Sequence, residues 1–139
     1  MNNATQELIR KYYAAFNALD MDAFLGLLHE QVVHDLNQRE RQVGREAFAR
    51  FMQRMNRCYR EQIVDLVVMT GEDGQRAAAE FVVLGEYLQT DEGLPAANGQ
   101  KYQLPGGAFF DIADGKITRV TNYYNLQEWL RQVGAQKQD

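Results

Sequence analysis

The apolar positions of the first sixty residues repeat with the spacing of amphipathic helices. One helix is predicted over residues 4–19, with an apolar face of Leu8, Tyr12, Ala15, Phe16 and Leu19. A second is expected to begin after the N-cap Asp20 and to bury Phe24, Leu27 and Leu28. A third, over residues 45–60, carries the stripe Phe48, Phe51, Met52, Met55 and Tyr59. All three helices therefore need a larger apolar surface to pack against.

Strands are predicted in the rest of the chain. Residues 31–38, QVVHDLNQ, form one short strand, and after Glu61 the apolar repeat changes to the alternation of a sheet. The long strands are expected at 63–69, 77–89, 101–112 and 117–125, with turns at Asp73-Gly74 and Asp114-Gly115. Pro105-Gly106-Gly107 indicates a bulge or bend in the third, and a short helix over 126–134 closes the chain.

Helices first and a four-strand meander afterwards are typical of an α+β fold. We expect one domain over residues 1–139, long enough to bury a substantial core. A bent antiparallel sheet wrapped around helices would form a cone with an apolar mouth. A pocket of that kind is a default site for a small apolar molecule.

Composition narrows the class of partner. The net charge of −4 disfavours nucleic acid, and Arg50, Arg54 and Arg57 are interpreted as a solvated helix face. The longest apolar run, FVVLGEYL, is too short to cross a bilayer, and no secretory signal is visible at the N-terminus. A single cysteine, Cys58, fits a reducing interior, so we expect a cytoplasmic location.

These residues resemble the nuclear transport factor 2-like superfamily. The similarity rests on "VVHDLNQ", "VGREAFARFM" and "FFDIADGKITRVTNYYN" in this order, and it covers nearly the whole chain. Within the superfamily the chain is similar to the ketosteroid isomerase and SnoaL-type polyketide cyclase branches. The resemblance implies the cystatin-like cone, with helices packed on a strongly bent, mostly antiparallel sheet.

The isomerase branch implies a carboxylate base and donors that hold an enolate oxygen, an arrangement that ketosteroid isomerase itself exemplifies. Its matching residues here are Asp35 as the base and Tyr12 as the main donor. The second donor, an acid in the family, falls near Ala108, so half of that oxyanion hole is missing. In an apolar pocket without a nearby cation, the pKa of Asp35 is expected to be raised.

The cyclase branch has its acid–base carboxylate near the last strand, where this chain has Asn122 and Asn125. Neither amide can act as a base at neutral pH. Besides Asp35 and Tyr12, the side chains expected to bind the substrate are Phe51, Met55, Tyr59, Ala108, Phe110, Asn122 and Tyr124. No cofactor is required, and His29 and His34 alone are too few for a metal site.

Each assignment has an alternative. Asp35 could cap the following turn, and Tyr12 could pair for packing reasons alone. His34 alternates to the face opposite Asp35, where a surface or interface position is expected, and Tyr13 is expected to point elsewhere. At the level of function, a non-catalytic module that binds a hydrophobic ligand is the alternative to an isomerase or cyclase.

A homodimer is also expected, through the outer face of the sheet. Phe109 and Tyr123 alternate outward, and Ala77 and Ala79 are expected to leave part of that face flat.

Overall fold

The structure is a computed structural model that describes residues 3–134. Four helices are present: α1 (Asn3–Ala18), α2 (Met21–Gly26), α3 (Arg45–Cys58) and α4 (Leu126–Gly134). The Asp20 side chain accepts a hydrogen bond from the backbone N–H of Ala23 at 3.2 Å and caps α2 as expected. Gly44 precedes α3 with a φ of 109°, a conformation that favours glycine.

Six strands form one sheet. They are β1 (Leu28–Asp35), β2 (Arg41–Val43), β3 (Tyr59–Thr70), β4 (Arg76–Tyr87), β5 (Gln100–Ala113) and β6 (Lys116–Tyr124). Their order in the sheet is β2-β1-β6-β5-β4-β3. Neighbours are antiparallel except β1 and β6, which run parallel. The predicted α+β fold and the four-strand meander are confirmed.

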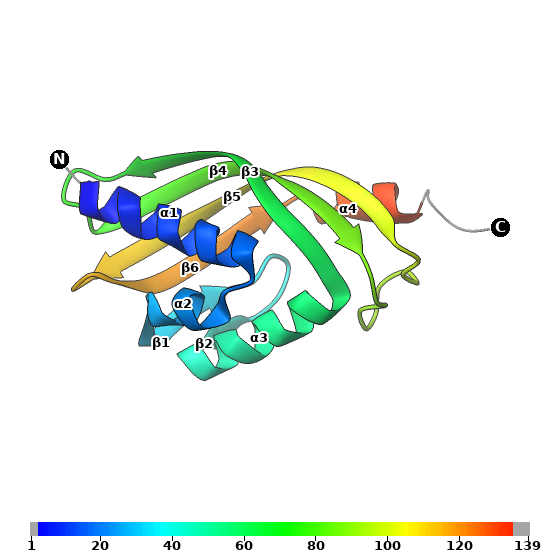
Figure 1. Cartoon of the computed structure of the whole chain (residues 1–139), viewed down its shortest axis with the longest axis horizontal. Helices are drawn as coiled ribbons and strands as arrows, with labels where there is room; N and C mark the ends of the chain where they lie inside the picture. Colours follow the sequence, from blue (N-terminus) through cyan, green and yellow to red (C-terminus); the bar gives the residue numbers. More distant parts are fainter. Residues whose placement is uncertain (1–2, 135–139) are drawn as a thin grey trace.

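The sheet arches over α1, α2 and α3, which lie on its concave face, and α4 lies at the far end (Figure 1). The core fills the space between these layers. Tyr12 of α1 packs on Phe24 of α2 and on Phe110 of β5, with ring centroids 4.6 and 5.4 Å apart. At the α4 end, the Trp129 ring packs edge-on against Tyr87 at 5.2 Å. Aromatic contacts thus join the helices to the concave face along its whole length.

Several element boundaries differ from the sequence prediction, and one strand was missed. Leu28, expected in the second helix, begins β1, and β3 begins at Tyr59, directly after α3. The short strand β2 was not predicted, because RQV has a single apolar residue and therefore shows no alternation. It nevertheless pairs with the end of β1, with Asp35 opposite Arg41.

Of the bulge or bend expected at Pro105-Gly106-Gly107, the bulge is not found. Residues 105–107 keep an unbroken register with β4, in which Gly106 lies opposite Phe81. A Cβ atom at Gly106 would lie 2.6 Å from the Phe81 ring. The glycine is therefore required for the close approach of an aromatic ring.

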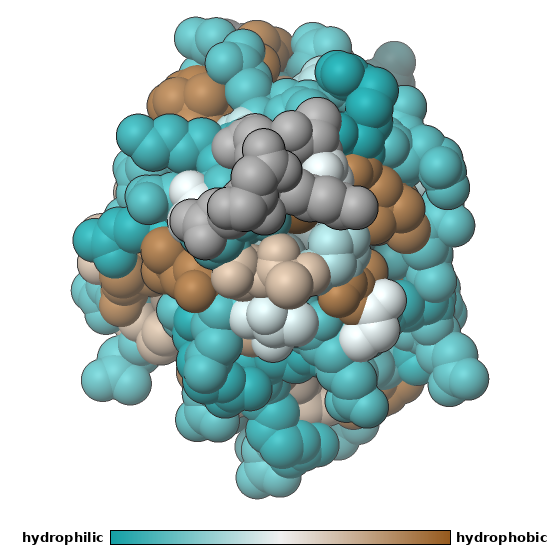
Figure 2. Space-filling view, turned by 90° about the vertical axis from the view of Figure 1, so that its right-hand side faces the viewer, coloured by the Kyte–Doolittle hydropathy of each residue, from teal (hydrophilic) through white to brown (hydrophobic). Residues whose placement is uncertain are grey.

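Figure 2 shows the end of the molecule that carries α4 and the loop of residues 88–99. The hydrophobic residues exposed on this face form separate areas among hydrophilic ones. Within residues 3–134, no helix combines the length and the apolar character needed to cross a membrane.

Candidate functional site

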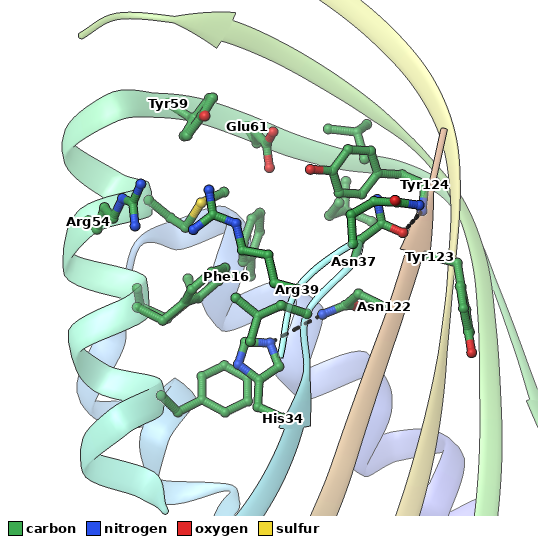
Figure 3. Close-up of a pocket in the computed structure, with 18 of the residues that line it drawn as sticks. Phe16, His34, Asn37, Arg39, Arg54, Tyr59, Glu61, Asn122, Tyr123 and Tyr124 are labelled. Atoms are coloured by element: carbon green, nitrogen blue, oxygen red, sulfur yellow. Dashed lines mark hydrogen bonds between the residues drawn. The ribbon is translucent and has the colours of Figure 1, made fainter. Parts of the chain in front are cut away.

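A cavity of about 260 Å³ lies between the concave face of the sheet and helices α1 and α3. Its wall is largely aromatic and aliphatic. Ionisable or amide side chains enter it from several elements: His34 and Asn122 from the strands, Asn37 and Arg39 from the loop after β1, Arg54 from α3 and Glu61 from β3 (Figure 3). Asp91 of the 88–99 loop lines it as well. An apolar body with a few convergent polar groups is typical of a small-molecule site.

Six of the predicted pocket residues do line this cavity: Tyr12, Phe51, Met55, Tyr59, Asn122 and Tyr124. Ala108 and Phe110 do not. Both are completely buried on the concave face, where α1 covers β5, and the Phe110 ring packs against Tyr12. Both therefore belong to the core beside the cavity.

The expected position of Asp35 inside an apolar pocket is wrong. Its carboxylate accepts two hydrogen bonds from Arg41, at 2.6 and 3.0 Å, and a third from the Thr121 hydroxyl at 2.6 Å. The hydrogen bond from Arg41 is the main reason why the pKa of Asp35 is held below its ordinary value, and the expected rise is also wrong. Asp35 does not line the cavity.

The side chains around Asp35 form an ionic ladder on the convex face of the sheet. We use this term for Arg41, Asp35, Thr121, Arg119, Asp111 and Arg76, which are joined in this order by hydrogen bonds or ion pairs. Arg119 donates to both oxygens of Asp111, at 2.9 and 3.0 Å. Asp35, the last residue of β1, is therefore stabilised by an ion pair and hydrogen bonds to side chains of the neighbouring strands.

His34 takes the position in the cavity that Asp35 was expected to hold. It is 1% exposed, and its ring stacks on Phe48 with centroids 3.9 Å apart. Burial lowers the pKa of His34 to about 4, against an opposing effect of the Asp35 charge, so the ring is neutral at pH 7. Nδ2 of Asn122 lies 3.4 Å from Nε2, which then accepts and leaves the ring proton on Nδ1. The expectation of a surface or interface histidine is wrong.

Three buried side-chain atoms within residues 3–134 have no hydrogen-bond partner: Tyr13 Oη, His34 Nδ1 and Asn37 Nδ2. All three residues line the same cavity. Tyr13, expected to point elsewhere, thus belongs to the site. Buried polar groups are almost always paired in folded proteins, with protein groups or ordered water, so these three atoms can donate to oxygen atoms of water or of a molecule in the cavity.

Glu61 brings a carboxyl group into the cavity from β3 (Figure 3). The Tyr102 hydroxyl donates to its Oε2 at 2.5 Å. Burial raises the pKa of Glu61, and the hydrogen bond from Tyr102 opposes that rise.

Asp91 is the second carboxylate of the cavity, and it is tightly held. It is 6% exposed and accepts hydrogen bonds from Arg54 at 2.6 Å and from the Tyr59 hydroxyl at 2.8 Å. The Tyr87 hydroxyl accepts from the backbone N–H of Asp91 at 2.9 Å. These contacts fix the 88–99 loop against α3 and β3.

The family model of the SnoaL-like domain matches residues 9–120. This chain belongs to the SnoaL-like family. The match contains the strands and helices that enclose the cavity, apart from the end of β6 and α4.

Solved structures resemble this SnoaL-like chain over nearly all of its length. A proposed polyketide cyclase from Pseudomonas putida is 65% identical, with a TM-score of 0.92 over 93% of this chain and 97% of its own. A proposed polyketide cyclase from Xanthomonas campestris is 61% identical, with a TM-score of 0.92 over 95% and 98%. A nuclear transport factor 2-like protein from Burkholderia xenovorans, 12% identical, shares the fold with a TM-score of 0.77 over 96% and 98%. No curated protein sequence matches.

Proposed function

We propose that this SnoaL-like protein is a cofactor-independent isomerase or cyclase that acts on a small, apolar, carbonyl-containing molecule. The observation that carries the proposal is the set of unpaired polar atoms on Tyr13, His34 and Asn37 around one apolar cavity. The two proposed polyketide cyclases with more than half of their residues identical support the same chemical class.

In this proposal the cavity stabilises an oxygen that becomes negative when a neighbouring carbon loses its proton. The hydroxyl groups of Tyr12 and Tyr13 and Nδ1–H of His34 are the donors. The lowered pKa keeps His34 neutral at pH 7, and a neutral imidazole still has one N–H group that can donate to the oxygen. Proton transfer between atoms of one molecule requires neither a metal nor a redox cofactor.

A test that needs no natural substrate uses 2-tetralone, a compact ketone whose hydrogens next to the carbonyl exchange with solvent. We expect the protein to bind it and to accelerate its deuterium uptake in deuterium oxide, followed by proton NMR. Tyr13→Phe should slow the uptake by about a hundredfold, because one donor to the developing oxyanion is lost. The affinity of the Tyr13→Phe variant for 2-tetralone should change much less. Wild-type protein that neither binds the ketone nor accelerates exchange contradicts the proposal.

The alternative is a protein that binds an apolar ligand without catalysis, and the position of Asp35 is the observation that favours it. The carboxylate expected to be the base lies on the convex face, outside the cavity. A protein that only stores or carries an apolar ligand would bind 2-tetralone without accelerating its exchange.

Ala108 stands where the isomerase branch has its second acid, so we expect little turnover of a simple unconjugated ketosteroid.

We further propose a homodimer through the convex face. Phe109 and Tyr123 are 48% and 58% exposed, with ring centroids 5.9 Å apart. Ala77 and Ala79 do not contribute, because both are buried on the concave face.

Sedimentation at micromolar concentration should find a dimer. The pair Phe109→Asp and Tyr123→Asp should make it monomeric, because buried charges oppose an apolar contact. Leu88→Asp, at an exposed loop residue, is the matched control. A wild-type monomer would contradict the proposal.

A further inference from the structure

The cavity needs a group that removes the proton, and two carboxyl groups reach it. Asp91 is already neutralised by Arg54 and held by the Tyr59 hydroxyl. Taking up a proton would break this ion pair, which makes Asp91 a poor base. Glu61 has a neutral partner: Tyr102 donates to Oε2, and no residue within 3–134 donates to Oε1. The second oxygen of Glu61 is thus available to a molecule in the cavity.

The Glu61–Tyr102 pair is held in place because Gly85, which lies between the two residues in the sheet, has no side chain. Glu61, Gly85 and Tyr102 are direct neighbours on three adjacent strands, β3, β4 and β5. A Cβ atom at Gly85 would lie 2.1 Å from the Tyr102 ring. The ring therefore occupies the space above the glycine and reaches across β4 to the carboxyl group. Any larger residue at position 85 would displace it.

We propose that Glu61 is the catalytic carboxylate of this cavity and that Tyr102 is its positioning residue, an inference that rests on the proposed function. Oε1 of Glu61 takes a proton from the carbon next to the substrate carbonyl. The electrons of the broken C–H bond form the enolate, whose oxygen is held by the donors. Glu61 then returns the same proton, either to another carbon in an isomerisation or to the alkoxide formed when the enolate carbon attacks a second carbonyl. No proton is gained or lost overall.

The surroundings of Glu61 shift its pKa in the direction that makes a carboxylate a stronger base. Burial raises the pKa of Glu61, and the hydrogen bond from Tyr102 opposes that rise. The other ionisable side chains that line the cavity are Arg39, Arg54, Tyr59, Asp91, Tyr123 and Tyr124, besides His34 and the tyrosines of α1. Arg54 is paired with Asp91, so its charge is largely compensated.

The deuterium uptake of 2-tetralone also tests this inference. Glu61→Gln should lower the rate by about a hundredfold or more while the ketone still binds, because the amide cannot accept the proton. Glu80→Gln, at an exposed glutamate of β4, is the matched control and should exchange at the wild-type rate. Tyr102→Phe should shift the pH profile of exchange upward, since the charged form of Glu61 loses its hydrogen bond.

The outcomes separate the two proposals. If Glu61→Gln exchanges the ketone as fast as wild type, the Glu61 assignment is wrong while the proposed function stands. If the wild-type protein binds 2-tetralone without accelerating its deuterium uptake, both the proposed function and the Glu61 assignment are wrong, and the protein is a ligand-binding module. A carboxyl NMR titration needs no ligand: it should place Glu61 above its ordinary pKa, and a value at or below 4.5 overturns the assignment.

Discussion

Lowering the pH from about 7 to about 4 should destabilise the fold by about 3 kcal/mol through His34 alone. Burial lowers the pKa of His34 from 6.5 to about 4. Between these values the unfolded chain binds a proton that the folded chain does not, so stability falls as the pH falls. The stabilisation is complete above the unfolded pKa and is lost progressively below it.

Carboxyl groups titrate in the same range, so the measurement is a difference between variants. Urea unfolding of wild type and His34→Gln between pH 4 and 7 should give curves whose separation shrinks as the pH falls. His29→Gln, at an exposed histidine of β1, should keep the wild-type pH dependence. An unchanged pH dependence in His34→Gln would show that this ring titrates normally.

Asp91→Ala should lower the free energy of unfolding by about 2–4 kcal/mol. The substitution removes an acceptor that is 6% exposed and leaves the Tyr59 hydroxyl without it. It also leaves Arg54 without its counter-charge. Because the Arg54 side chain is 34% exposed, it can reach water, and the loss should be smaller than for a fully buried pair.

Chemical denaturation of the single and double variants measures this coupling. Arg54→Leu should also destabilise, and the double variant should lose less than the sum of the two. Glu92→Ala, at the exposed neighbour of Asp91, is the matched control and should lie within about 0.5 kcal/mol of wild type. Additive single effects would show that the ion pair contributes no coupling.

Long apolar repeats made most of the fold predictable. Phe51, Met55 and Tyr59 lie on the apolar stripe predicted for the third helix, and Asn122 and Tyr124 share one face of the last predicted strand; all five line the cavity. The same reasoning could have found Glu61, which shares a strand face with Tyr59 and Ile63. It was missed because β3 begins before the alternation becomes visible.

Asp35 shows where the sequence stops being informative. The alternation of His34 and Asp35 was right, but both Val32 and Val33 are apolar, so nothing local decides which face of β1 turns inward. That choice depends on Arg41 in a strand without an apolar pattern and on Thr121 at a distance of 86 residues. The family match favoured the wrong face. Likewise, the partner of Asp91 is 37 residues away and has no local signal.

The parallel pairing of β1 with β6 has a consequence for synthesis on the ribosome. β1 and β2 emerge early, yet β1 meets its main neighbour only when residues 117–121 have left the exit tunnel. Until then the first two strands form an isolated pair with an open edge, which is marginal in water. The meander from β3 to β5, whose neighbours follow each other along the chain, can pair in the meantime. We therefore expect the cavity between the sheet and the helices to form last, only once β6 has joined the N-terminal strands to the rest of the sheet.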